Sequence, residues 1–441
     1  MVKNPLLICD FDFINLKNLF LLNIHLNIEI IISDFKEHMK MKNMVYIQSG
    51  GPTSVINTSF YGAIREAQRH ADQIDHIYGS QHGIEGLIFD DLIDIGQEDD
   101  EQIELLLQTP GSILGTTRRK LPKDINDPVY GQIIENLKKH EIKYVFINGG
   151  NDSMDTCYKI SQLVKQQGLD IVVIGVPKTI DNDLAATDHS LGFPSCAKFV
   201  VNTVNALIKD ACCFMVGKVH IVEIMGRDAG WLTASPDVLP ENNRPHLFYL
   251  PENKFDLDQF LKDVKAVYER EGYAMVCISE GIQFPRDMSN VRVDGFGHAQ
   301  LGGAAADLCH IVEDKLNLPT RAVELSLTQR ACPVFISQVD RDEAIKTGTV
   351  AVQAALQGET GKMVVFKRVS NHPYAIEYKL EDLSKVANAV SLVPQSMMNG
   401  VTGMNESFRE YIRPLLEGEV TLKCKDGVAL LTNFKRVKVQ A

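Results

Sequence analysis

The sequence has no unbroken apolar run of the length that a membrane-spanning helix needs, which is about 20 predominantly apolar residues. Its most apolar stretch lies near the N-terminus and is interrupted by Asn23, His25, Asn27 and Glu29. The same stretch lacks the basic start and small-residue cleavage site of a signal peptide. We therefore expect no membrane partner.

Paired cysteines and excess positive charge are also missing. The nine cysteines include no C-x-x-C pair and no zinc-ligand spacing, and Cys212 and Cys213 are adjacent. This usage predicts reduced thiols in a cytoplasmic protein. The formal net charge of −12 argues against a nucleic acid partner. It leaves room for an anionic small molecule, because a local cluster of Lys and Arg can still form a positive pocket.

The first 40 residues differ in composition from the rest of the chain and are rich in Ile, Leu, Asn and Phe. Met39, Met41 and Met44 come just before the first clear strand pattern. One interpretation is that residues 1–40 lie outside the functional fold and that translation begins near Met41. The other is a genuine N-terminal arm.

The remaining chain alternates short, continuous apolar runs with amphipathic helical patterns such as residues 57–71 and 127–141. This alternation predicts an α/β fold with parallel sheets covered on both faces. Each run is followed by a glycine-rich or acidic loop, and in parallel sheets ligands bind beyond the carboxyl ends of the strands. The runs begin at Met44, Tyr144, Ile171, Val219 and Tyr273.

Two of these loops have glycine turns that suit phosphate. SGGPTSVIN (49–57) leads into a predicted helix, and NGGNDSMD (148–155) places an amide, a carboxylate and a hydroxyl after two glycines. Exposed backbone N–H groups at a helix N-terminus can hold a phosphate. The first of these loops, 49–57, is neither a P-loop nor a G-x-G-x-x-G fingerprint, and a purely structural turn is the alternative interpretation of it.

The stretch PKTIDND (177–183) offers a lysine, a threonine and two carboxylates within a few residues. In an extended segment Asp181 and Asp183 would point the same way, which suits a general base beside a phosphate or metal site. A plain surface loop is the alternative. Further candidate anion ligands lie in GSILGTTRRK (111–120) and TQR (328–330). MGRDAGW (225–231) and SEG (279–281) offer an arginine and a carboxylate after buried strands.

Taken in order, these loops resemble the phosphofructokinase family from about Met41 to the region of Arg368. The resemblance implies two Rossmann-like α/β domains with the active site in the cleft between them. The donor domain would comprise residues 41–192 with about 328–372, and the sugar-phosphate domain residues 193–327 with about 373–441. The resemblance also implies an activity, the transfer of a phosphoryl group to the 1-hydroxyl of fructose 6-phosphate with Mg²⁺. A homo-oligomer, dimer or tetramer, is the expected assembly.

The resemblance also implies roles for individual residues. Asp181 would be the base that takes the proton of the sugar 1-hydroxyl, with Lys178, Thr179 and Asp183 beside the transferring group. The expected donor-phosphate ligands are Gly51, Arg118, Asp152 and Ser153. The expected sugar-phosphate ligands are Thr179, Asp181, Met225, Gly226, Arg227, Glu280 and Arg330. The expected metal ligands are Asn151 and Asp152.

The phosphoryl donor is indicated by two positions. ATP-using members read GGDGS and have glycine before the threonine of TIDND, whereas pyrophosphate-using members read GGDDS and have lysine there. This chain has Asp152 and Lys178, so the resemblance implies pyrophosphate. Asn151 departs from the family's aspartate and weakens the expectation for Mg²⁺. An ATP-dependent phosphofructokinase and a non-catalytic sugar-phosphate-binding paralogue remain the alternatives.

Overall fold

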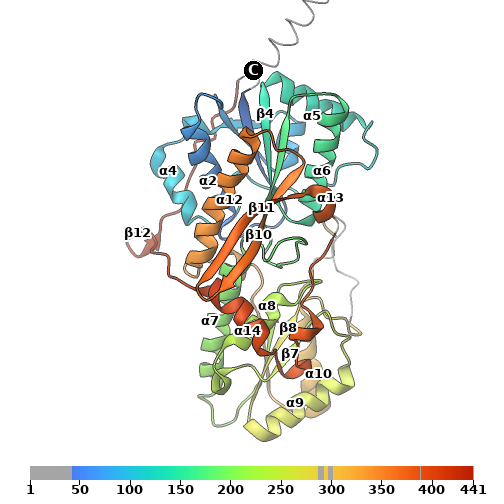
Figure 1. Ribbon diagram of the computed structural model, residues 1–441. Coiled ribbons are helices and arrows are strands. Elements are labelled where there is room, and N and C mark those ends of the chain that lie inside the picture. Colours follow the sequence, from blue (N-terminus) through green and yellow to red (C-terminus); the bar gives the residue numbers. More distant parts are fainter. Residues whose placement is uncertain (1–41, 287–292, 296–300, 388, 441) are drawn as a thin grey trace, which may run out of the picture.

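The computed structural model describes residues 42–286, 293–295, 301–387 and 389–440, so the N-terminal extension lies outside the described residues. Two large β-sheets organise this part of the chain, one in each lobe of Figure 1. The first lobe is built on seven strands. In spatial order these are β11 (Tyr374–Asp382), β10 (Lys362–Asn371), β5 (Val172–Pro177), β4 (Ile142–Gly149), β1 (Asn43–Gln48), β2 (Ile77–Ser80) and β3 (Leu92–Asp94).

The interior strands of this sheet pair in parallel, and only the two edge pairs, β2–β3 and β10–β11, are antiparallel. Helices cover both faces. They are α2 (Ile56–Arg69), α3 (Ile84–Ile88), α4 (Asp100–Glu104), α5 (Pro128–Lys139), α6 (Asn151–Gln166), α12 (Gln338–Leu356) and α13 (Leu383–Val386).

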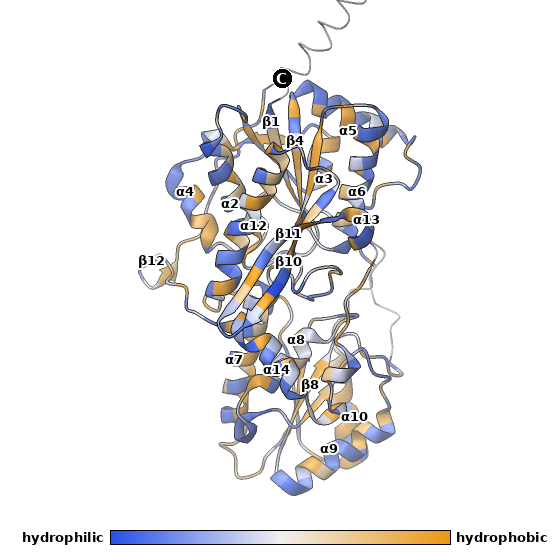
Figure 2. Ribbon diagram, viewed as in Figure 1, coloured by the Kyte–Doolittle hydropathy of each residue, from blue (hydrophilic) through white to orange (hydrophobic). Residues whose placement is uncertain are grey.

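The continuous apolar runs exist because the interior strands are buried on both sides. In β1, Met44 and Tyr46 pack in the core with α2 and α12, whereas Val45 and Ile47 pack in the core with α5 and α6. Alternate residues of a strand point to opposite faces, so burial of both faces requires an unbroken apolar sequence. Figure 2 shows hydrophobic residues gathered along the central strands of both lobes.

The second lobe has four parallel strands, in the order β7 (Leu247–Tyr249), β8 (Ala274–Ser279), β6 (Val219–Ile224) and β9 (Thr320–Glu324). Two layers of helices again enclose the sheet: Met275 and Cys277 face the core that includes α7 and α14, while Val276 and Ile278 face the core of α9 and α10. The helices of this lobe are α7 (Phe193–Ala211), α8 (Trp231–Ala234), α9 (Leu257–Glu271), α10 (Ala304–Leu316), α11 (Thr328–Ala331) and α14 (Glu406–Ile412).

Residues 420–440, here called the C-terminal strap, return to the first lobe. They include β12 (Cys424–Lys425) and β13 (Val428–Ala429), and they run beside the edge strand β3. Hydrogen bonds fix the strap to the first lobe: Asp94 N–H donates to Val437 O at 2.9 Å, and Val439 N–H donates to Leu92 O at 3.0 Å.

Strand pairing corrects the sequence-based domain division. That division placed residues 373–441 with the sugar-phosphate domain, but β11 pairs with β10 along its whole length, and the strap lies on the first lobe. Both contacts are long-range, so local sequence pattern does not reveal them. We propose that the first domain comprises residues 42–192, about 332–387 and 420–440. The second domain would then comprise residues 193–331 and 389–419. No helix in the described ranges is long and apolar enough to cross a membrane.

Candidate active site

Five strands lead into one cavity between the two lobes. These are β1, β4 and β5 of the first sheet and β6 and β8 of the second, and each ends one or two residues before a lining residue. The cavity has a volume of about 390 Å³. The polar loops therefore meet at the carboxyl ends of parallel strands, as the sequence pattern predicted.

The cavity brings together nearly all of the site residues expected from the sequence. Gly226 is the exception; it lies between two lining residues and its N–H points to Glu280 Oε1 at 3.5 Å. The expected residues that line the cavity are Gly51, Arg118, Asn151, Asp152, Ser153, Lys178, Thr179, Asp181, Asp183, Met225, Arg227, Glu280 and Arg330.

The glycine pair after β4 lets the N-terminus of α6 reach the cavity. A Cβ on Gly149 would lie 2.2 Å from Ser153 Oγ, so a larger residue would push the first turn of α6 away from the strand. Gly150 precedes the helix, and Asn151, Asp152 and Ser153 form its first turn. A helix N-terminus offers N–H groups and the positive end of the helix dipole, which favour an anion.

Lys178 supplies a buried cation to this wall of the cavity. Its side chain is 2% exposed, and Nζ donates a hydrogen bond to Gly51 O at 2.5 Å. Burial, together with the positive charges of Arg330 and Arg118, lowers the pKa of Lys178 to about 7. An anionic phosphate in the cavity would favour the charged form of Lys178 and bind more tightly in turn.

Asp152 is paired with a residue whose role the sequence did not reveal. Lys120 Nζ lies 3.2 Å from Asp152 Oδ1, and both residues line the cavity. The sequence showed Lys120 only as the end of a basic stretch, because the ion pair joins segments far apart in the chain. The lysine partly neutralises Asp152 and so reduces the repulsion between this carboxylate and an anion bound at the helix terminus.

The segment containing Asp181 and Asp183 is not extended, which corrects the geometry assumed from the sequence. Asn182 has φ 57°, in the left-handed region. Its side chain stabilises this conformation: Oδ1 accepts a hydrogen bond from Ser190 N–H and Nδ2 donates to Tyr411 Oη, each at 2.9 Å. Asparagine tolerates this region better than most residues. Asp181 and Asp183 both line the cavity despite the bend.

The environment of the two carboxylates favours their protonated forms. Desolvation by the surrounding protein raises the pKa of Asp181, and the nearby charges of Asp183 and Glu280 raise it further. Desolvation also raises the pKa of Asp183, partly offset by hydrogen bonds from Thr179 and Asn151. A carboxylate with a raised pKa is a stronger base when it is ionised, which suits proton abstraction from a hydroxyl.

Two buried oxygen atoms fit a bound divalent cation. Asn151 Oδ1 and Asp183 Oδ1 are both buried and have no hydrogen-bond partner among the described residues. The two side chains are adjacent, since Asn151 Nδ2 donates to Asp183 Oδ2 at 3.3 Å. The described residues contain no group of three or more His, Cys, Asp or Glu that could hold a metal. Carboxylate and amide oxygens are ligands that hard divalent cations prefer.

The loops after β6 and β8 are held together by close backbone contacts. Ser279 Oγ donates to Gly226 O, and a Cβ on Gly281 would lie only 1.7 Å from Arg227 O. Glycine is therefore required at 281, because any side chain would separate the two loops. The contact places Arg227 and Glu280 on the same wall of the cavity.

Two guanidinium groups approach the glycine turn after β1. A Cβ on Gly51 would lie 2.9 Å from Arg330 Nη1 and 3.6 Å from Arg118 Nη2. Burial and the charge of Arg118 lower the pKa of Arg330, while Arg118 also forms an ion pair with Asp294. The residues assigned to the donor and to the sugar phosphate thus meet at Gly51, where planar guanidinium groups can bind phosphate oxygens in pairs.

Some lining residues had no assigned role from the sequence. Asp228 follows Arg227 in a loop that was recognised only for its arginine, and Val390 comes from a distant segment with no motif. Asp228 had a visible signal, since it is a second charged residue after a buried strand, whereas Val390 had none.

Comparison with known proteins identifies the architecture. Residues 43–355 match the model of the family described as Phosphofructokinase. The chain belongs to the phosphofructokinase family. Two relatives in this family are named pyrophosphate–fructose 6-phosphate 1-phosphotransferase. That of Halomonas elongata is 38% identical, over 91% of this chain and 98% of its own length. That of Xanthomonas campestris pv. campestris is 38% identical, over 90% and 97%.

The family assignment extends to solved structures. The crystal structure of a pyrophosphate-dependent phosphofructokinase from Nitrosospira multiformis superposes on this chain with a TM-score of 0.83 and 36% identity. The match covers 91% of this chain and 98% of that one. The phosphofructokinase fold expected from the motifs is therefore confirmed.

Proposed function

We propose that this chain is a pyrophosphate-dependent 6-phosphofructokinase. It transfers a phosphoryl group from pyrophosphate to the 1-hydroxyl of fructose 6-phosphate and releases phosphate. The observation that carries the proposal is the pair Asp152 and Lys178 on one wall of the cavity, beside the N-terminus of α6. The carboxylate occupies space that a nucleotide would need, and the buried cation suits a donor that has no adenosine to contribute binding energy.

The chemistry follows from the placement of the remaining charged groups. Asp181 takes the proton from the sugar 1-hydroxyl as that oxygen forms a bond to phosphorus, and the bond to the bridging oxygen of pyrophosphate breaks. Lys178 and Arg118 stabilise the charge on the donor, while Arg227, Arg330 and Glu280 hold the sugar phosphate. Mg²⁺ would be held by Asn151 and Asp183 in place of the expected pair Asn151 and Asp152, because Asp152 is paired with Lys120. The ion would supply charge neutralisation on the phosphates when bound. Phosphoryl transfer depends on this alignment and neutralisation more than on covalent chemistry.

A donor assay tests the proposal directly. The purified protein is given fructose 6-phosphate and Mg²⁺ with either pyrophosphate or ATP at matched concentrations, and fructose 1,6-bisphosphate is measured. We expect turnover with pyrophosphate and little or none with ATP. A preference for ATP would show that the chain is an ATP-dependent enzyme, and sugar-phosphate binding without turnover would show a non-catalytic paralogue.

Loss of a guanidinium group should weaken binding of the sugar phosphate. Arg227→Ala or Arg330→Ala should raise the KM for fructose 6-phosphate by about 10- to 100-fold, because a charge-assisted phosphate contact is lost. Steady-state kinetics with each substrate varied in turn measures this. Arg119→Ala is the matched control, since Arg119 does not line the cavity. A rise in the pyrophosphate KM alone would mean that the two substrate positions are exchanged.

Asn151 offers a test of the metal site that does not depend on turnover. Asn151→Asp should tighten Mg²⁺ binding at least about 5-fold, because a carboxylate adds the negative charge that the amide lacks. Asn151→Ala should weaken binding, because it removes an oxygen ligand. Calorimetric titration with Mg²⁺ in the presence of pyrophosphate measures both. Equal Mg²⁺ affinity in all three proteins would remove Asn151 from the site.

We also propose a cytoplasmic location and a homo-oligomeric assembly, dimer or tetramer. All eight cysteines among the described residues are free thiols, which suits a reducing compartment. Analytical ultracentrifugation of the full chain would give the number of subunits.

A further inference from the structure

Tyr411, on α14 in the second lobe, reaches the residue that separates the two active-site carboxylates. Its hydroxyl accepts a hydrogen bond from Asn182 Nδ2 at 2.9 Å. The same hydroxyl donates to Asp188 O at 2.9 Å. Because both its donor and its acceptor capacity are used, the hydroxyl holds the Asn182 amide in one orientation.

The tyrosine ring is itself fixed by a guanidinium group. Arg368 lies over the ring with its guanidinium carbon 4.5 Å from the centroid. Its Nη1 donates to Tyr411 O at 2.7 Å, and its Nη2 forms an ion pair with Asp188 at 2.8 Å. Arg368 is on β10, so a strand of the first lobe orients a helix of the second. A cation over an aromatic face and a charge-assisted hydrogen bond together leave the ring little freedom.

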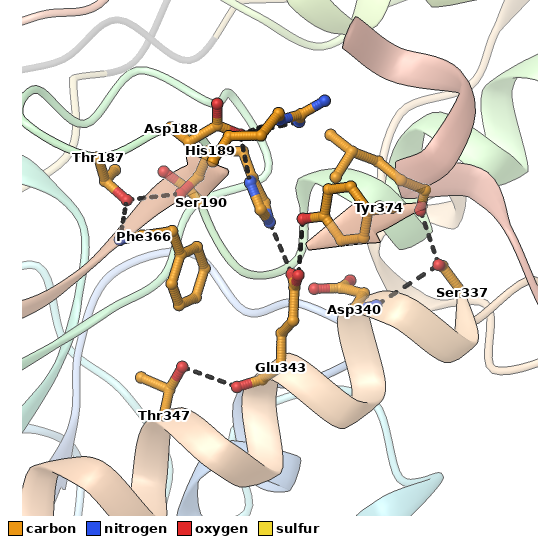
Figure 3. Close-up of polar contacts among 12 residues, drawn as sticks. Thr187, Asp188, His189, Ser190, Ser337, Asp340, Glu343, Thr347, Phe366 and Tyr374 are labelled. Carbon is orange, nitrogen blue, oxygen red and sulfur yellow. Dashed lines mark hydrogen bonds and ion pairs between the residues drawn. The ribbon is translucent and has the colours of Figure 1, made fainter. Parts of the chain in front are cut away.

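A buried histidine completes the arrangement (Figure 3). His189 Nδ1 lies 2.9 Å from Asp188 Oδ2, and Nε2 lies 2.7 Å from Glu343 Oε2. Burial favours the neutral imidazole, but the carboxylates of Glu343 and Asp188 outweigh it and raise the pKa of His189 to about 9. His189 is therefore charged at neutral pH. Two cations, His189 and Arg368, balance the two carboxylates, and a buried network that is fully paired specifies one conformation.

We propose that Tyr411 is a positioning residue for catalysis, which holds Asn182 in its left-handed conformation and so directs Asp181 and Asp183 into the cavity. The inference rests on the proposed function, because it concerns the geometry of the same site. A bend of φ 57° at Asn182 sets the directions of both neighbouring carboxylates. A displacement of about 1 Å in a reacting group can cost on the order of 100-fold in rate.

Two matched substitutions test the proposal. Tyr411→Phe removes only the hydroxyl that contacts Asn182. Tyr374→Phe removes a hydroxyl that donates to Glu343 at 2.7 Å and that makes no contact with Asn182. We expect Tyr411→Phe to lower kcat with pyrophosphate by about 10-fold or more, with both KM values within about 3-fold of wild type. Tyr374→Phe should keep kcat within about 2-fold. An equal loss of kcat in the two variants, or none in Tyr411→Phe, would overturn the proposal.

Coupling to Asn182 separates positioning from general loosening of the fold. Asn182→Gly removes the amide and still permits positive φ. In that background Tyr411→Phe should change kcat less than about 2-fold, because its partner is already gone. A 10-fold loss that persists would show that Tyr411 acts by another route. Absence of turnover in the wild-type protein would refute the proposed function instead, since the comparison of variants presupposes that activity.

Discussion

Asp181→Asn is expected to lower kcat by about 10²- to 10⁴-fold, the scale on which a general base contributes. Binding of fructose 6-phosphate should remain nearly intact. The amide has almost the same size as the carboxylate, and Arg227 and Arg330 still bind the phosphate of the sugar. Kinetics gives the loss of turnover, and calorimetric titration with the sugar phosphate gives the affinity. Turnover within a few-fold of wild type would remove Asp181 from the role of base.

A carboxylate from the second lobe that also lines the cavity provides the control for this variant. Asp228 lines the cavity beside Arg227, so Asp228→Asn changes the local charge without removing the base. It should lose far less activity than Asp181→Asn.

The pH dependence of turnover gives a second check. Because the pKa of Asp181 is raised, wild-type activity should fall as pH drops through that raised pKa. The residual activity of Asp181→Asn should not show this fall at low pH, because the titrating carboxylate is absent.

Asp152→Gly is expected to permit some use of ATP. The substitution opens the space beside the N-terminus of α6 that a nucleotide would need, and it releases Lys120 from its 3.2 Å ion pair. Turnover with ATP should stay poor, because removal of a block does not create contacts with adenine. The measurement is kcat/KM for ATP and for pyrophosphate with saturating fructose 6-phosphate.

Adding Lys178→Gly to this variant should lower kcat/KM for pyrophosphate by a further 10- to 100-fold, about the value of one charge-assisted phosphate contact. Asp155→Gly is the matched control, since Asp155 lies on the same helix but does not line the cavity. It should leave the donor preference unchanged. If Asp152→Gly still rejected ATP completely, the carboxylate would not be the feature that excludes the nucleotide.

The strands and the order of the active-site loops could be predicted because their signals are local. An interior parallel strand must be apolar throughout, and a loop at its carboxyl end carries the polar residues that follow it in sequence. β4 and the turn at Gly149 and Gly150 illustrate this, since strand, turn and helix start are contiguous. The resemblance in seven ordered loops then indicated the family.

The features that were not predicted depend on contacts between distant segments. β11 alternates partly buried and exposed residues, so its sequence does not show which sheet it joins. The left-handed conformation of Asn182 is stabilised by Tyr411, more than 200 residues away in the chain. The ion pair between Lys120 and Asp152 could not be predicted, because it joins segments far apart in the chain. Spacing along the chain carries no information on such pairings.

The path of the chain has a consequence for synthesis on the ribosome. During synthesis β5 lacks its partner β10, and β3 lacks the C-terminal strap, until after the four strands of the second sheet have been translated. The four strands of the second sheet, by contrast, all lie within residues 219–324. We expect the second sheet to form while the nascent first sheet still has two open edges. Open strand edges are templates for aggregation, so premature termination within the last 80 residues should yield insoluble chains.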